Sequence, residues 1–164
     1  MDRLFRFPNP VNEVSARLVA AGVVVQCLAI LAGVTWLIGV LAYGFVARVA
    51  TGPTLSPLGQ LVTRGITPRL DVRPRPVPGP PKRFAQGIGA TLSLTAAVLH
   101  FAFAESTLAL IPVGLILVAA TLESMLGFCA GCWLFARLMD WGVIPERICE
   151  ACADLSTRPG SAAV

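Results

Sequence analysis

The stretch Gly127-Phe128-Cys129-Ala130-Gly131-Cys132 follows directly on a membrane-length apolar run and contains a pair of cysteines. After sixteen intervening residues comes a second pair, Cys149-Glu150-Ala151-Cys152, so the full pattern is C-x2-C-x16-C-x2-C. Four of the five cysteines of the chain lie in this pattern. The chain upstream consists mostly of apolar runs, which indicates that the cysteine-rich end, residues 127–152, is held at one face of a membrane.

The composition is that of an integral membrane protein. Hydrophobic residues make up 55% of the 164 residues and charged residues 13%, with a mean hydropathy of +0.75, whereas a soluble domain is about a quarter charged. We therefore predict one membrane domain in contact with the lipid bilayer, residues 1–155, and a disordered tail, residues 156–164. The net charge of +4 comes from basic residues in the expected loops and does not predict a nucleic-acid partner.

The longest apolar run, residues 16–49, is too long to cross a membrane once. As a single helix it would reach roughly 50 Å at ~1.5 Å per residue, against a hydrocarbon core of ~30 Å. Gly33 to Thr35 is the best position for a break, with Gly39 as the runner-up, which gives two spans at about 16–32 and 35–50. Because both spans are near the lower limit of length, a re-entrant pair is the alternative.

Two further spans follow a polar, proline-rich loop at residues 51–83. They cover about 85–104 and 108–126, with the polar turn at Glu105 between them. The sequence thus predicts an all-α membrane protein with four transmembrane helices in two hairpins, plus short interfacial helices at the cytoplasmic face.

A stripe of small residues lies along the third span. Gly89, Ser93 and Ala97 recur every four residues, a spacing that places them near one another on one side of a helix. Small residues let another backbone approach closely in a membrane. We therefore expect the third span to pack tightly against a neighbouring helix.

The positions of the thirteen basic residues predict the orientation. The expected turns near Gly33 and Glu105 carry neither lysine nor arginine, whereas three basic residues lie in the N-terminal segment, seven in or beside the central loop and three in the C-terminal part. By the positive-inside rule, both termini and both cysteine pairs are cytoplasmic in a multi-pass protein of the inner membrane.

The first cysteine pair lies where dithiol chemistry is favoured. Cys129 and Cys132 come where a span ends and a short helix begins, and a helix N-terminus stabilises a thiolate. Cys149 and Cys152 would then be the resolving or exchanging pair. Redox exchange or sulfur transfer by these four cysteines is one interpretation of the pattern.

A four-thiolate zinc site is the alternative interpretation. Two C-x2-C pairs at this separation are typical of such sites, because each pair supplies two corners of a tetrahedron. Zinc is then the cofactor, and its ligands are Cys129, Cys132, Cys149 and Cys152. A third interpretation is that the four are buried, reduced thiols without a reaction, since a permanent disulfide is disfavoured in the cytoplasm.

Two ionisable residues lie inside the expected spans. Glu123 is one helical turn before Gly127, so it is a candidate proton acceptor for a thiol; the commoner arrangement would be an ion pair, with Arg137 as the expected partner. His100 lies toward the outer end of the third span and is expected to be an interfacial hydrogen-bonding residue. Cys27, in the middle of the first span, is expected to be a small apolar core residue.

Four motifs together carry a resemblance to a known family: Phe7-Pro8-Asn9-Pro10-Val11-Asn12-Glu13, Pro81-Lys82-Arg83-Phe84-Ala85-Gln86, Gly127-Phe128-Cys129-Ala130-Gly131-Cys132, and Gly142-Val143-Ile144-Pro145-Glu146 with the C-x2-C that follows it. In this combination the sequence resembles the domain-of-unknown-function 4395 family, small bacterial membrane proteins common in actinobacteria. The resemblance covers nearly the whole chain up to about Asp154. The family has no assigned activity, but members encoded near thioredoxin-like or rhodanese-like proteins imply thiol or sulfur chemistry.

The favoured hypothesis is a membrane-anchored dithiol component that exchanges electrons or sulfur with a soluble thioredoxin-like or rhodanese-like partner. The alternative hypothesis is a non-enzymatic membrane scaffold with a structural four-cysteine zinc site. Assembly into a homo-oligomer is compatible with both.

Overall fold

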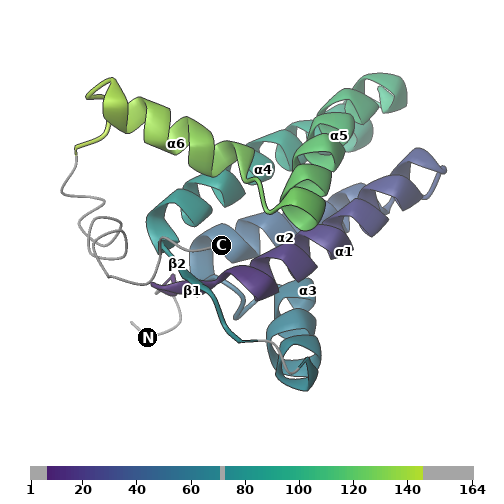
Figure 1. The fold of residues 1–164 in the computed structure, drawn as a ribbon. Coiled ribbons are helices and arrows are strands. Elements are labelled where there is room, and N and C mark those ends of the chain that lie inside the picture. Colours follow the sequence, from purple (N-terminus) through teal and green to yellow (C-terminus); the bar gives the residue numbers. More distant parts are fainter. Residues whose placement is uncertain (1–6, 71–72, 146–164) are drawn as a thin grey trace.

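The computed structural model describes residues 7–70 and 73–145, and most of these residues are helical, as predicted (Figure 1). A two-residue antiparallel pair joins β1 (Val11–Asn12) to β2 (Pro76–Val77). The longer helices are α1 (Glu13–Leu31), α2 (Leu37–Thr51), α4 (Gly79–Ala97), α5 (Ser106–Thr121) and α6 (Ala130–Asp140). The shorter helical elements are α3 (Pro57–Gln60), η1 (Leu61–Ile66), η2 (Thr67–Arg69), η3 (Val98–Ala102), which continues α4, and η4 (Leu122–Leu126), which continues α5.

Local chemistry explains where the first apolar run begins and breaks. The side chain of Asn12 accepts a hydrogen bond of 3.1 Å from the backbone N–H of Val14, which caps the start of α1. The run turns at Gly33, whose φ of +106° is readily adopted only by glycine. The chain then continues as α2, which has 15 residues.

The bundle is built by packing of α4 against α2 and α5, and of α1 against α5. Gly89 of α4 faces Phe45 of α2 so closely that a Cβ at position 89 would lie 2.2 Å from the Phe45 ring. Ser93 is fully buried in the same helix, and the next buried small residue is Ala96. The expected close approach is therefore confirmed at Gly89. Ala97, the third member of the stripe, is partly buried and packs against the core.

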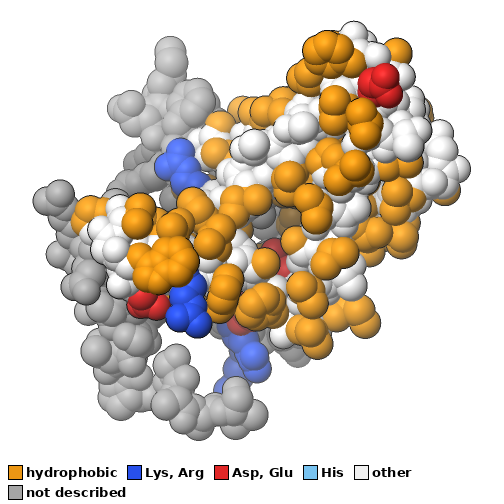
Figure 2. Space-filling model, turned by 90° about the horizontal axis from the view of Figure 1, so that it is seen from above, with side chains coloured by type: hydrophobic (Ala, Val, Ile, Leu, Met, Phe, Trp, Pro, Cys, Tyr) orange, Lys and Arg blue, Asp and Glu red, His pale blue; other side chains and the backbone are white. Residues whose placement is uncertain are grey.

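Three helical stretches are long and apolar enough to cross a membrane: Glu13–Leu31, Gly79–Ala102 and Ser106–Leu126. Helix α2 is also apolar but shorter. Many large apolar side chains point outward from these helices, including Val25, Ile111, Leu115, Val118 and Leu126, and Figure 2 shows apolar side chains over much of the face in view. Such an apolar surface suits lipid rather than water, so the chain is a membrane protein.

The two ends of the bundle differ in structure and charge. The α1–α2 turn and the α4–α5 turn lie at the same end of the molecule (Figure 1), and neither contains lysine or arginine. The β1–β2 pair, α3 and α6 lie toward the other end (Figure 1). There the backbone N–H of Gly79 donates to the Asn9 side chain at 3.1 Å, which ties the start of α4 to the N-terminal segment.

Candidate functional site

The first cysteine pair lies at the start of a helix, where its two members have different backbone roles. Cys129 is the N-cap residue of α6, with φ −95° and ψ 103°, and its carbonyl accepts a 3.0 Å hydrogen bond from the N–H of Trp133. Cys132 follows in the first turn of the helix. Both side chains are partly buried and carry free thiols. The positive end of the helix dipole therefore lies beside the Cys129 sulfur.

The structure favours glycine at both glycine positions of the stretch Gly127–Cys132. Gly127 ends η4 in the left-handed region, with φ +69°, and so turns the chain from α5 toward α6. A Cβ on Gly131 would lie 2.5 Å from the Cβ of Ala85, so only glycine lets α6 approach α4 this closely. The Phe135 ring then packs on Phe84 with 5.5 Å between ring centroids. These contacts fix the cysteine pair against the first turns of α4.

Arg17 of α1 also fixes the turn. Its Nε and Nη2 both donate to the carbonyl of Ser124 at 3.2 Å, and Nη2 also donates to the carbonyl of Met125 at 2.9 Å. These carbonyls lie in the last turn of η4, where helical partners are missing. A single arginine of the first helix thus holds the end of the helix that precedes the cysteines.

Beside the thiols lies a buried ion pair. Lys82 Nζ of α4 and Glu123 Oε1 of η4 are 2.5 Å apart, with side chains only 10% and 15% exposed. The expected pairing of Glu123 with Arg137 is therefore wrong: the guanidinium of Arg137 lies over the Trp133 ring instead, 5.5 Å from its centroid. Glu123 is therefore engaged in an ion pair with Lys82 rather than with Arg137. The sequence analysis missed Lys82, although it is the only lysine in the chain.

The environment shifts the pKa values of the two thiols in opposite directions. A hydrogen bond from the Cys132 side chain and, more weakly, the Lys82 ammonium lower the pKa of Cys129, against the opposing effects of burial and the Glu123 carboxylate. The same hydrogen bond with Cys129, together with burial, raises the pKa of Cys132. The thiolate is the nucleophilic form of cysteine. Of the two thiols, Cys129 is therefore the one that ionises more readily.

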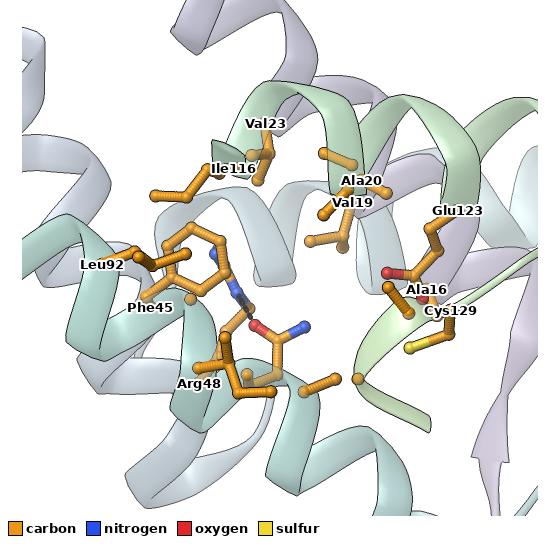
Figure 3. Close-up of a pocket in the computed structure, with 18 of the residues that line it drawn as sticks. Ala16, Val19, Ala20, Val23, Phe45, Arg48, Leu92, Ile116, Glu123 and Cys129 are labelled. Atoms are coloured by element: carbon orange, nitrogen blue, oxygen red, sulfur yellow. Dashed lines mark hydrogen bonds between the residues drawn. The ribbon is translucent and has the colours of Figure 1, made fainter. Parts of the chain in front are cut away.

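A cavity of about 280 Å³ extends from the Cys129 sulfur to Arg48 of α2 (Figure 3). The Arg48 side chain is 5% exposed and lies over the Phe45 ring, 4.4 Å from its centroid. Its Nε donates to Gln86 Oε1 at 2.9 Å and its Nη1 to Ser56 Oγ at 3.2 Å. Apolar side chains form most of the wall, among them Val19, Val23, Leu92 and Ile116. The Cys129 thiol and the Arg48 guanidinium thus line the same largely apolar cavity.

The remaining candidate residues lie elsewhere. Cys27 is fully buried in the apolar core of α1. His100 lies near the α4–α5 turn, with Nδ1 3.1 Å from the hydroxyl of Ser106. Cys149 and Cys152 lie outside the described residues.

Of the four cysteines of the alternative zinc site, the described residues include two. Within residues 7–70 and 73–145, no group of three or more histidine, cysteine, aspartate or glutamate side chains is arranged to hold a metal ion. Cys129 and Cys132 supply two thiol ligands, and a four-thiolate site would need Cys149 and Cys152 to complete it.

The fold and this site define a class: a helical membrane protein with a C-x2-C pair at a helix start, beside a buried ion pair. The chain belongs to the family described as domain of unknown function (DUF4395), which matches residues 11–140. The match includes the first cysteine pair, Lys82 and Glu123, and ends before Cys149. No curated protein and no solved structure matches the chain.

Proposed function

We propose that the protein is a membrane-anchored dithiol component that exchanges electrons or sulfur with a soluble thioredoxin-like or rhodanese-like partner. The observation that carries the proposal is the position of Cys129 at the N-cap of α6, with Cys132 in the following turn. Helix dipole, neighbouring thiol and Lys82 ammonium all favour a thiolate at Cys129. Such a pair has the asymmetry that exchange requires, namely one attacking and one resolving sulfur.

The exchange step balances with a partner disulfide as oxidant. The Cys129 thiolate attacks one sulfur of that disulfide and forms a mixed disulfide, and the other partner sulfur leaves as a thiolate. The Cys132 thiol loses its proton and attacks Cys129 Sγ, which releases the second partner thiolate. Two electrons pass from the protein to the partner. In sulfur transfer, the Cys129 thiolate instead takes the terminal sulfur of a partner persulfide, and the partner cysteine leaves as a thiolate.

The same proposal includes four spans, with α2 as the fourth, and both termini in the cytoplasm. The basic side chains support this orientation, because Arg17 and Lys82 contact the end of the helix that precedes the cysteines and Arg48 lines the same cavity as Cys129. The two opposite turns carry neither lysine nor arginine. A cytoplasmic thiol pair is accessible to soluble partners of that compartment. Of the two leading hypotheses, the zinc scaffold has only the cysteine spacing in its favour.

The test uses the full-length protein, purified anaerobically in detergent, with oxidised thioredoxin as the probe. Cys132→Ser should trap a mixed disulfide between thioredoxin and Cys129, whereas Cys129→Ser should trap none at this pair. Cys27→Ser, a buried thiol far from the site, is the matched control and should behave as the parent does. One bound zinc per chain with all four paired cysteines protected from alkylation would instead establish the zinc scaffold.

A further inference from the structure

The cavity between Cys129 and Arg48 contains an unusual buried cation. Arg48 is 5% exposed, yet its hydrogen-bond partners Gln86 and Ser56 are neutral. Among the described residues, its Nη2 is the one buried side-chain polar atom without a hydrogen-bond partner. A buried donor without a partner is costly, and Glu123, the carboxylate that lines the same cavity, is paired with Lys82 instead of with Arg48. The guanidinium is therefore preorganised for an acceptor that enters the cavity and takes on negative charge.

The rest of the cavity restricts what that acceptor can be. Its walls are mostly apolar, from side chains of α1, α2, α4 and α5. Its volume of about 280 Å³ is near the lower end of the ~300–1,000 Å³ range of small-molecule sites, which suits a ring system rather than a whole lipid. Figure 3 shows the Cys129 sulfur on the side that faces the cavity. The occupant is thus an apolar ring with an oxygen acceptor, within reach of a nucleophilic thiol.

We propose that this cavity binds the ring of a lipid-soluble quinone, with one carbonyl oxygen on Arg48 Nη2, and that the quinone oxidises the Cys129–Cys132 pair. The proposal rests on the dithiol function above and names its second substrate. A quinone combines the required properties: it partitions into the bilayer, accepts hydrogen bonds at its oxygens and takes two electrons. Negative charge develops on those oxygens during reduction, and the buried Arg48 guanidinium, with its unpartnered Nη2, favours it.

Oxidation of the cysteine pair by the quinone requires no further oxidant or reductant. The Cys129 thiolate adds to a ring carbon of the quinone, and its electron pair moves onto a ring oxygen. Cys132 then attacks Cys129 Sγ, the sulfur–carbon bond breaks, and its electrons remain on the ring. The products are one Cys129–Cys132 disulfide and one hydroquinone. The two protons lost by the thiols end on the two quinone oxygens.

Binding is measured first, by titration calorimetry on detergent-purified Cys129→Ser/Cys132→Ser protein, which removes the redox step. The probe is dimethylnaphthoquinone, whose substituted ring carbons prevent permanent arylation of thiols. Adding Arg48→Gln should weaken binding about tenfold or more, the factor expected for one charged hydrogen bond. Arg83→Gln, whose side chain does not line the cavity, is the charge-matched control and should bind as the parent does.

A second pair of variants tests the cavity while Arg48 is kept, since replacement of this buried arginine can itself disrupt folding. Ala119→Phe fills the cavity from α5, whereas Val118→Phe enlarges an outward-facing neighbour that is 60% exposed. The first should abolish binding and the second should not. Equal binding in all variants, or no measurable binding of the quinone to the protein that retains Arg48, would overturn the proposal.

Electron transfer is measured with the cysteine-containing protein under anaerobic conditions. One hydroquinone should form for each Cys129–Cys132 disulfide, located by peptide mass spectrometry, and Arg48→Gln should slow the reaction at subsaturating quinone. Binding without disulfide formation would overturn the proposal. If quinone oxidises the pair but thioredoxin does not exchange with it, the partner part of the proposed function fails and the quinone site stands.

Discussion

Lys82 and Glu123 form a buried ion pair, 2.5 Å from Nζ to Oε1, between the first turn of α4 and the last turn of the α5–η4 helix. The pair joins two spanning stretches at the level of the cysteine turn. It also explains how a carboxylate can lie near a nucleophilic thiol without suppressing its ionisation. The Glu123 charge raises the pKa of Cys129 and the Lys82 charge lowers it, so the two partners oppose each other at that sulfur.

Removal of one partner of the ion pair should destabilise the protein and slow the alkylation of Cys129. Lys82→Met leaves a buried carboxylate without a counter-charge, which costs about 3–5 kcal/mol in comparable pairs. The free energy of unfolding in detergent should fall by that order. Alkylation of Cys129 at neutral pH should also become slower, because the pKa of the thiol rises without the ammonium. Lys82→Met/Glu123→Leu replaces both charges and should recover most of the stability; failure to recover it would show that the ion pair is not the source of the loss.

The contact between α4 and α2 provides a second prediction. Gly89→Ala places a methyl group 2.2 Å from the Phe45 ring, so the helices must separate or the ring must move. We expect a loss of about 1–3 kcal/mol in the free energy of unfolding, partly restored by Phe45→Leu. Gly87→Ala is the matched control in the same helix, since a Cβ there has no neighbour within 4 Å. It should be neutral or stabilising, because alanine favours a helix more than glycine does. An equal loss in both variants would show that the contact with Phe45 is not the cause.

The sequence predicted what short-range patterns determine. The run over residues 16–49 exceeds a single span, and a glycine marks its break. The end of an apolar run before Gly127 predicted a helix start at the cysteine pair. In the structure Gly127 has a left-handed backbone, which is typical of a residue that ends a helix. These features depend on neighbours within a few residues, so they could be derived from the chain alone.

The partners inside the site could not be derived in this way. Lys82 and Glu123 are 41 positions apart, and Arg48 and Gln86 are 38 positions apart. Local patterns do not specify such pairs, which depend on how the helices pack. The stripe also drifts around the helix, because four-residue steps exceed the 3.6-residue turn. Ala96 is therefore fully buried, whereas Ala97 is partly buried against the core.

The topology predicts the compartment of each loop. A reporter fused after Val164 or inserted within residues 74–81 should be active in the cytoplasm, because the basic residues lie on that side. A reporter inserted at Gly33, where a side chain would meet no neighbour within 4 Å, should be active on the opposite face. Paired alkaline phosphatase and fluorescent-protein fusions measure both outcomes. A cytoplasmic signal at Gly33 would support a re-entrant pair instead of two spans.

Substitutions at Cys132 separate its hydrogen bond from its role as the resolving thiol. The hydrogen bond from Cys132 is the largest cause that lowers the pKa of Cys129. Cys132→Ser retains a donor and Cys132→Ala removes it, although neither can form a disulfide. A lower pKa means that the thiolate forms at lower pH, so the alkylation rate of Cys129 should rise at lower pH in the serine variant. At neutral pH the serine variant should therefore react faster than the alanine variant.

The measurement is the rate of iodoacetamide alkylation of the Cys129 peptide, followed by mass spectrometry from about pH 5 to pH 10, on either side of the free-thiol pKa of ~8.5. Cys27→Ser serves as the control, because Cys27 is fully buried in the core of α1 and should not alter the profile. The parent and the serine variant should reach half of the maximal rate below the pH of a free cysteine peptide. Identical profiles for the serine and alanine variants would exclude the hydrogen bond as the cause, and a Cys129 profile that matches free cysteine would remove the physical basis for its role as the attacking thiol.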